Sequence, residues 1–128
     1  MKEIISTPKA RAALGPYSQA NVVGNMIFTS GMIPIIPETG AIIEGGIKEQ
    51  ATQAISNLIA LLEETGSDAQ SVVKTTVFIK NMDDFAAVNE VYATFFTDAY
   101  PSRSCVEVAR LPKDVLIEIE AIALNKDA

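Results

Sequence analysis

The residues best suited to chemistry lie in the last third of the chain. Arg103 follows Tyr100-Pro101-Ser102 at the start of a strand-like stretch. Its planar guanidinium presents a fork that matches a carboxylate and forms strong bidentate hydrogen bonds. The same fork suits an internal ion pair with Glu107, Glu118 or Glu120. The sequence alone therefore leaves two roles open for Arg103: binding a ligand carboxylate or pairing within the protein.

Two glutamates and one thiol near Arg103 could take part in proton transfer or nucleophilic attack. Glu118 and Glu120 alternate with isoleucines in one stretch, so they lie on one face of a strand. Such a pair can serve as general acid–base groups, although paired strand glutamates are more often solvated or ion-paired. Cys105 is the only cysteine, and the chain has no histidine to activate it. We therefore interpret Cys105 as an inert, packed thiol.

Two shorter motifs in the first third of the chain could line a pocket. Tyr17 follows the turn Gly15-Pro16 and suits either a pocket lid or an ordinary surface position. Ser30-Gly31 ends a strand-like stretch, where a glycine allows a ligand to approach the backbone closely, although a simple turn is the more frequent explanation. Gly45-Gly46 has no lysine and no phosphate-binding fingerprint, so it does not predict a nucleotide loop.

The composition excludes several classes of function. The 128 residues contain no histidine and one cysteine, which rules out histidine-based triads and histidine- or cysteine-rich metal sites. A net charge of −6 disfavours broad phosphate contact, so we expect no nucleic-acid partner. No apolar run has the roughly 20 residues of a membrane span. We expect a cytoplasmic protein, and a single domain over residues 1–128.

Hydrophobic periodicity predicts short strands at the start of the chain, followed by two helices that alternate with longer strands. Turn signals before residue 47 separate short strands, notably 26–30, in an antiparallel meander. Apolar residues at helical spacing predict a helix from Ile47 to Leu62, with Gly66 as its C-cap. A strand over 72–80 follows, and a second helix begins after Asn81 and ends before Tyr100. Ranges 102–109 and 115–124 read as the last two strands.

The alternation of side chains in the last two strands predicts which faces they present. Val115, Ile117 and Ile119 begin an apolar set that continues along the second strand. If the two strands are neighbours, burial aligns this set with the valines of the first strand. The other face then carries Arg103, Cys105, Glu107, Leu116, Glu118, Glu120 and Ile122. Two helices can cover only one side of a sheet, and we expect them on the apolar side. The mixed face is then available to a partner subunit or a binding site, unless it is simply solvated.

Several stretches together resemble the RidA family of imine (enamine) deaminases over almost the whole chain. They begin with Gly15-Pro16-Tyr17-Ser18-Gln19 and Phe28-Thr29-Ser30-Gly31. The middle of the chain contributes 73–78 and 85–89. The most specific stretch is Pro101–Asp114, followed by Ile117-Glu118-Ile119-Glu120-Ala121.

The resemblance implies a chorismate-mutase-like α+β fold, with a mixed sheet and two helices on one face. It implies a homotrimer whose sheets form a central barrel, with clefts between subunits. Its implied reaction is cofactor-independent hydrolysis of 2-iminobutanoate, 2-iminopropanoate and their enamine tautomers to 2-keto acids and ammonia. In this sequence Arg103 corresponds to the carboxylate-binding arginine and Glu118 to the acid that activates water. The remaining implied cleft residues are Tyr17, Ser30, Gly31, Asn89 and Cys105.

Two alternatives of other classes remain. One is a regulatory module that binds small carboxylates without turnover, for which the arginine alone would suffice. The other is an RNA-acting or translation-inhibiting protein, which the acidic balance and the lack of histidine weigh against.

Overall fold

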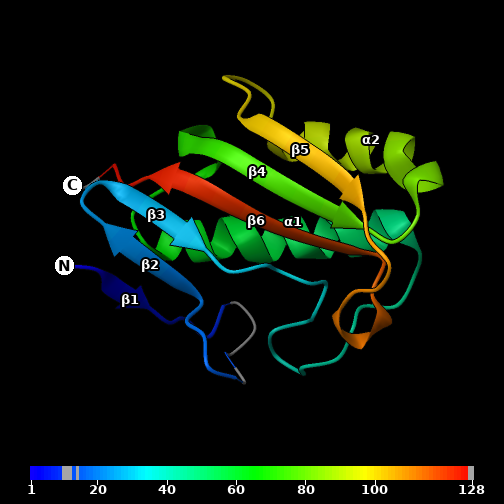
Figure 1. Ribbon diagram of the computed structural model, residues 1–128, viewed down its shortest axis with the longest axis horizontal. Coiled ribbons are helices and arrows are strands. Elements are labelled where there is room, and N and C mark those ends of the chain that lie inside the picture. Colours follow the sequence, from blue (N-terminus) through cyan, green and yellow to red (C-terminus); the bar gives the residue numbers. More distant parts are fainter. Residues whose placement is uncertain (10–12, 14, 127–128) are drawn as a thin grey trace.

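The computed structural model describes residues 1–9, 13 and 15–126, which form one six-stranded sheet with two helices on one side (Figure 1). The strands are β1 (Glu3–Ile5), β2 (Ala20–Val23), β3 (Met26–Thr29), β4 (Val72–Ile79), β5 (Ser102–Glu107) and β6 (Ile117–Leu124). The helices are α1 (Ile47–Glu64) and α2 (Phe85–Phe95), accompanied by the short 3-10 turns Ala69–Ser71, Met82–Asp84 and Pro112–Asp114. This arrangement confirms the α+β prediction with a mixed sheet.

The strand order is β1-β2-β3-β6-β4-β5, so the last strand along the chain lies inside the sheet. β4 and β5 pair in parallel, and every other pair is antiparallel. The meander predicted before residue 47 is confirmed for β1 to β3. Beyond it, residues 32–46 run mostly without strand pairing and make two isolated bridges, Met32 to Ile119 and Ile35 to Ile42.

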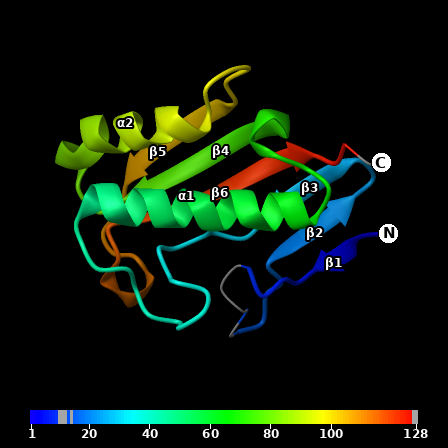
Figure 2. The same cartoon turned by 180° about the vertical axis from the view of Figure 1, so that it is seen from behind.

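Both helices cover the same face of the sheet, as the view from behind shows (Figure 2). α1 buries an apolar stripe against β6, whose Ile117, Ile119, Ala121 and Ala123 are all buried. Gly66 ends the helix as predicted, although the C-cap itself is Thr65: Gly66 follows it with a φ of +85°, and the amides of Gly66 and Ser67 donate to the carbonyls of Glu63 and Leu62. Asn81 caps the 3-10 turn that leads into α2, through a bond from the Asp83 amide.

The predicted pairing of the last two strands is wrong, because β4 lies between β5 and β6. Thr75 of β4 is opposite both Arg103 and Ala121, so Arg103 and Cys105 share the helix-covered face. Phe78 is opposite Glu118, on the other face. The chain therefore separates Arg103, Cys105 and Glu107 from Leu116, Glu118, Glu120 and Ile122, which had been expected beside them.

Within the described ranges, no helix combines the length and apolar character that a membrane span requires.

Candidate active site

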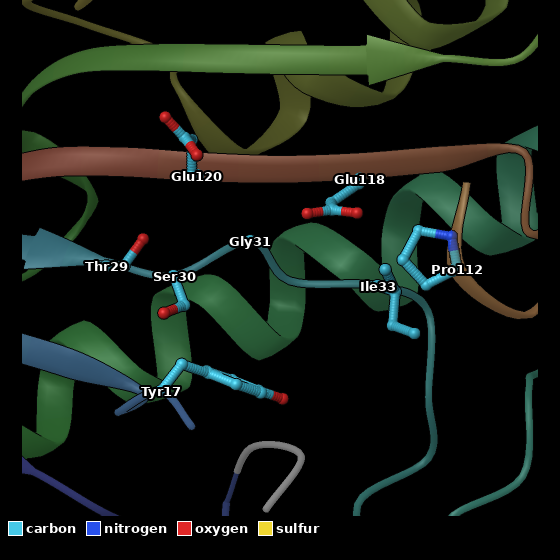
Figure 3. A pocket seen from close by; sticks show the side chains of 8 residues that line it. All are labelled: Tyr17, Thr29, Ser30, Gly31, Ile33, Pro112, Glu118 and Glu120. Atoms are coloured by element: carbon cyan, nitrogen blue, oxygen red, sulfur yellow. The ribbon is translucent and has the colours of Figure 1, made fainter. Parts of the chain in front are cut away.

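Two hollows, one on each face of the sheet, contain most of the side chains singled out from the sequence. The larger has a volume of about 620 Å³ and lies on the face without helices (Figure 3). It is lined by Tyr17, Thr29, Ser30, Gly31, Ile33, Pro112, Glu118 and Glu120.

Gly31 brings bare backbone against the carboxylate of Glu118. A Cβ atom built on Gly31 would lie 1.8 Å from Glu118 Oε2, so any side chain at this position would force the Glu118 carboxylate to move. The neighbouring residues keep this approach close, since Met32 and Ile119 exchange two backbone hydrogen bonds of 2.6 and 3.0 Å. A glycine is therefore required at position 31 for Glu118 to keep its present orientation.

Ser30 fastens the segment that carries Tyr17. Its hydroxyl donates to the Ser18 carbonyl at 2.6 Å, and its amide donates to the Gln19 carbonyl at 2.8 Å. Gln19 is buried and its side-chain amide donates to the carbonyl of Thr7. The hydroxyl of Ser30 thus holds the backbone that forms the wall of the hollow, and the half-exposed Tyr17 ring lines one side of it.

The second hollow, of about 410 Å³, lies beside α2 on the helix-covered face and contains Arg103. It is lined by Asn89, Tyr92, Ala93, Phe96, Tyr100, Pro101 and Arg103. Arg103 Nη1 donates to Asn89 Oδ1 at 2.7 Å. The guanidinium carbon lies 4.8 Å from the centre of the Tyr92 ring and 5.4 Å from that of Phe85.

The ion pair offered as an alternative role for Arg103 does not form in the described part of the chain. Glu118 and Glu120 lie on the opposite face, and Glu107 accepts a hydrogen bond from the Met82 amide. Among the described residues, the side chain that accepts a hydrogen bond from the guanidinium is Asn89, a neutral group. Among the described residues, the edge formed by Nε and Nη2 therefore remains available to a ligand.

Cys105 lies two residues along β5 from Arg103, on the same face. Burial raises the pKa of its thiol, and the positive charge of Arg103 partly offsets that rise. A raised pKa keeps the thiol protonated near neutral pH, which agrees with the interpretation of an unreactive side chain.

The site residues predicted from the sequence thus fall into two groups. Tyr17, Ser30, Gly31 and Glu118 share the larger hollow. Asn89 and Arg103 share the smaller one, with Cys105 next along β5. One chain does not bring Arg103 and Glu118 into a common cavity.

Sequence reasoning missed three side chains around Arg103: Phe85, Tyr92 and Thr75. Phe85 and Tyr92 belong to the apolar stripe of the second helix, which is typical of core packing, and Tyr92 and Thr75 are buried. A signal was present, because Phe85, Asn89 and Tyr92 follow a spacing of four and three residues and share one helix face. No group of three metal-ligating side chains forms within residues 1–9, 13 and 15–126.

The sequence model of the endoribonuclease L-PSP family matches residues 7–125. The chain belongs to this family. A member from Pyrococcus abyssi, named a RutC family protein, is 57% identical over 98% of each chain. The 2-iminobutanoate/2-iminopropanoate deaminase of Escherichia coli K12 is 51% identical over 98% of this chain and all of its own.

Several solved structures have the same fold as this chain. A putative endoribonuclease from Thermotoga maritima superposes with a TM-score of 0.95 at 54% identity, over 98% of this chain and 99% of its own. A Rid family protein from Yersinia pestis gives 0.94 at 43% identity, over 97% and 99%. The E. coli TdcF structure with bound serine gives 0.90 at 48% identity, over 95% and 98%. The resemblance drawn from the sequence is thus confirmed at the level of the family.

Proposed function

We propose that this L-PSP family member hydrolyses 2-imino acids, such as 2-iminobutanoate and 2-iminopropanoate and their enamine tautomers, to 2-keto acids and ammonia. The observation that carries the proposal is a guanidinium held by neutral groups, with one edge open to a carboxylate ligand. Near-full-length relatives named 2-iminobutanoate/2-iminopropanoate deaminase support this reaction class.

The reacting cleft in this proposal lies between two subunits of a homotrimer. Arg103 and Glu118 face opposite sides of the sheet, so one substrate can meet both only if a second copy completes the site. Three sheets that close into a central barrel would place the Arg103 hollow of one subunit beside the Glu118 hollow of the next. The face without helices supports this packing, because it exposes Phe28 and Val106 beside Glu118 and Glu120.

The proposed chemistry requires positioning and proton transfer. Arg103 binds the carboxylate, with the backbone at Cys105 and the Asn89 and Tyr17 side chains around the substrate. Glu118 accepts a proton from water, whose oxygen bonds to the imine carbon while the C=N electron pair moves to nitrogen. Glu118 returns this proton to the nitrogen, which gives the neutral carbinolamine. Glu118 then takes up the hydroxyl proton as the C=O bond forms and the C–N bond breaks, and passes it to the departing nitrogen, which leaves as ammonia. One water is consumed for each keto acid formed, with no electron transfer.

The decisive experiment generates 2-aminocrotonate with a dehydratase and times keto-acid release with and without the protein. We expect faster release with the wild-type protein, and a loss of about 10²–10⁴ in kcat for Glu118→Gln, because an amide cannot accept the proton. Glu120→Gln, on the same strand face, is the matched control and should keep most turnover. Release at the spontaneous rate with folded wild type would refute the deaminase. An active Glu118→Gln beside an inactive Glu120→Gln would reverse the assignment of the two acids.

A carboxylate-binding regulatory module is the second candidate, favoured by the bound serine of the TdcF structure. It predicts saturable binding of 2-oxobutanoate that Arg103→Ala abolishes, together with keto-acid release at the spontaneous rate.

A further inference from the structure

The face of α2 that meets Arg103 holds the guanidinium between two aromatic rings. Phe85 and Tyr92 are seven residues apart, so about 10.5 Å of helix rise separates them. The guanidinium carbon lies 5.4 and 4.8 Å from their ring centres, and it is bonded to Asn89, which lies between them on the same face. The two rings therefore flank the cation.

The Tyr92 ring is itself fixed in place. Its hydroxyl shares a 2.8 Å hydrogen bond with Oγ1 of Thr75, which is fully buried and lies opposite Arg103 in the β4–β5 register. The ring also packs on Phe96, with 4.5 Å between centres. Burial raises the pKa of the Tyr92 hydroxyl, so it stays neutral and adds no negative charge that would compete for the arginine.

A ring face stabilises a cation without occupying its N–H groups. An acidic partner would stabilise Arg103 equally well, but it would use the fork that a ligand needs. Here Asn89 accepts from Nη1 and the rings attract the charge, so that among the described residues the Nε–Nη2 edge remains available to a ligand.

We propose that Phe85 and Tyr92, with Thr75 bonded to Tyr92, are positioning residues that hold the Arg103 guanidinium in the orientation required for bidentate carboxylate binding. This inference rests on the proposed function for its kinetic consequence, but the orientation of Arg103 can be tested without it.

The kinetic test compares Phe85→Leu with Phe95→Leu, a half-buried phenylalanine of the same helix that packs on the core instead of Arg103. We expect Phe85→Leu to raise both KM and the dissociation constant of 2-oxobutanoate about 2- to 30-fold, the range of a cation–π contact, with a smaller change in kcat. Phe95→Leu should leave both constants near wild type. Equal constants for the two variants, each folded by circular dichroism, would overturn the proposal.

The role of the Tyr92 hydroxyl is tested by a double-mutant cycle. Tyr92→Phe and Thr75→Val each remove the same hydrogen bond, so each should raise KM about 2- to 10-fold and the double variant should lose little more. Fully additive losses would contradict a shared role in orienting Arg103.

A spectroscopic measurement separates this inference from the proposed function. The Arg103 Nε–H resonance, identified by its absence in Arg103→Lys, should be displaced by ring currents in the ligand-free protein. Phe85→Leu should move it towards the position of an exposed arginine, whereas Phe95→Leu should not. A displaced signal in a protein that hydrolyses no imine would refute the deaminase and keep the positioning. An undisplaced signal in an active enzyme would refute the positioning alone.

Discussion

At the scale of single residues, the molecule keeps a half-buried arginine charged without giving it an acidic partner in the described part of the chain. Leaving a cation unpaired normally costs stability, and here two rings and an amide oxygen offset part of that cost. The charge and the hydrogen-bond donors of the guanidinium, which an internal ion pair would have occupied, are thus available to a negatively charged ligand. Arg103 is therefore the residue whose replacement most directly tests binding.

Arg103→Ala should lower kcat/KM for imine hydrolysis about 10²- to 10³-fold, because it removes a charge-assisted fork. Arg103→Lys should recover only part of that loss, since an ammonium cannot form two parallel hydrogen bonds. Steady-state kinetics on folded variants check both. Full activity of Arg103→Lys would show that charge alone suffices.

Cys105→Ala should keep at least about a tenth of wild-type turnover, because the thiol packs and takes no part in the proton transfers. The pH dependence of the thiol provides a second check. Burial raises its pKa, so alkylation by iodoacetamide, which needs the thiolate, should reach half its maximum rate above the pH of an ordinary cysteine. Arg103→Ala removes the charge that lowers this pKa and should shift the midpoint further upward. A midpoint at or below that of free cysteine would contradict this assignment.

At the scale of elements, local periodicity predicts both helices and most strands, but it does not predict which strands are neighbours. Side-chain alternation sorts Arg103 from Val106 correctly, since these residues lie on opposite faces of β5. The prediction of which β5 side chains share a face with those of β6 is wrong, because β4 lies between the two strands. The polar set of β5 lies on the helix side because the aromatic face of α2 accepts Arg103 there, a tertiary contact that no single strand encodes.

Asn57 of α1 should matter for stability, since it connects that helix to the wall of the larger hollow. Its buried side-chain amide donates to the carbonyls of Ile33 and Ile35 at 3.1 and 2.8 Å. Asn57→Leu keeps the volume but removes both donors, and should lower the free energy of unfolding by about 1–3 kcal/mol. Urea denaturation measures this. Gln53→Leu, one turn earlier and half-buried, removes only the 2.9 Å bond from Gln53 Nε2 to Asn57 Oδ1 and should cost less. An equal cost would argue against the bonds from Asn57 to Ile33 and Ile35.

At the scale of the whole molecule, the two hollows lie on opposite faces of one sheet. In the proposed trimer each chain therefore contributes its Arg103 hollow to one cleft and its Glu118 hollow to another. The sequence could supply the residues of both halves, through the family resemblance. It could not show that they face away from one another, because strand order depends on long-range pairing.

Mixed assemblies should regain activity that neither parent has. Arg103→Ala and Glu118→Gln copies, co-expressed with different tags and purified through both, should show about a third of wild-type activity, because a closed ring of three with both types has one cleft with both native side chains. Arg103→Ala copies purified through two tags are the control and should stay inactive. Absence of recovery in mixed assemblies of trimer mass would exclude a cleft shared between subunits.

The place of β6 in the sheet has a consequence for the order of folding. β6 follows every other strand along the chain, yet it pairs with β3 on one side and β4 on the other. Until β6 has left the ribosome, the β1–β3 meander and the β4–α2–β5 unit have no strand to join them. The apolar stripe of α1 likewise lacks Ile117, Ile119 and Ala121 until then. We therefore expect the native sheet to form only once β6 is available, with a rate set by closure of long loops around this strand.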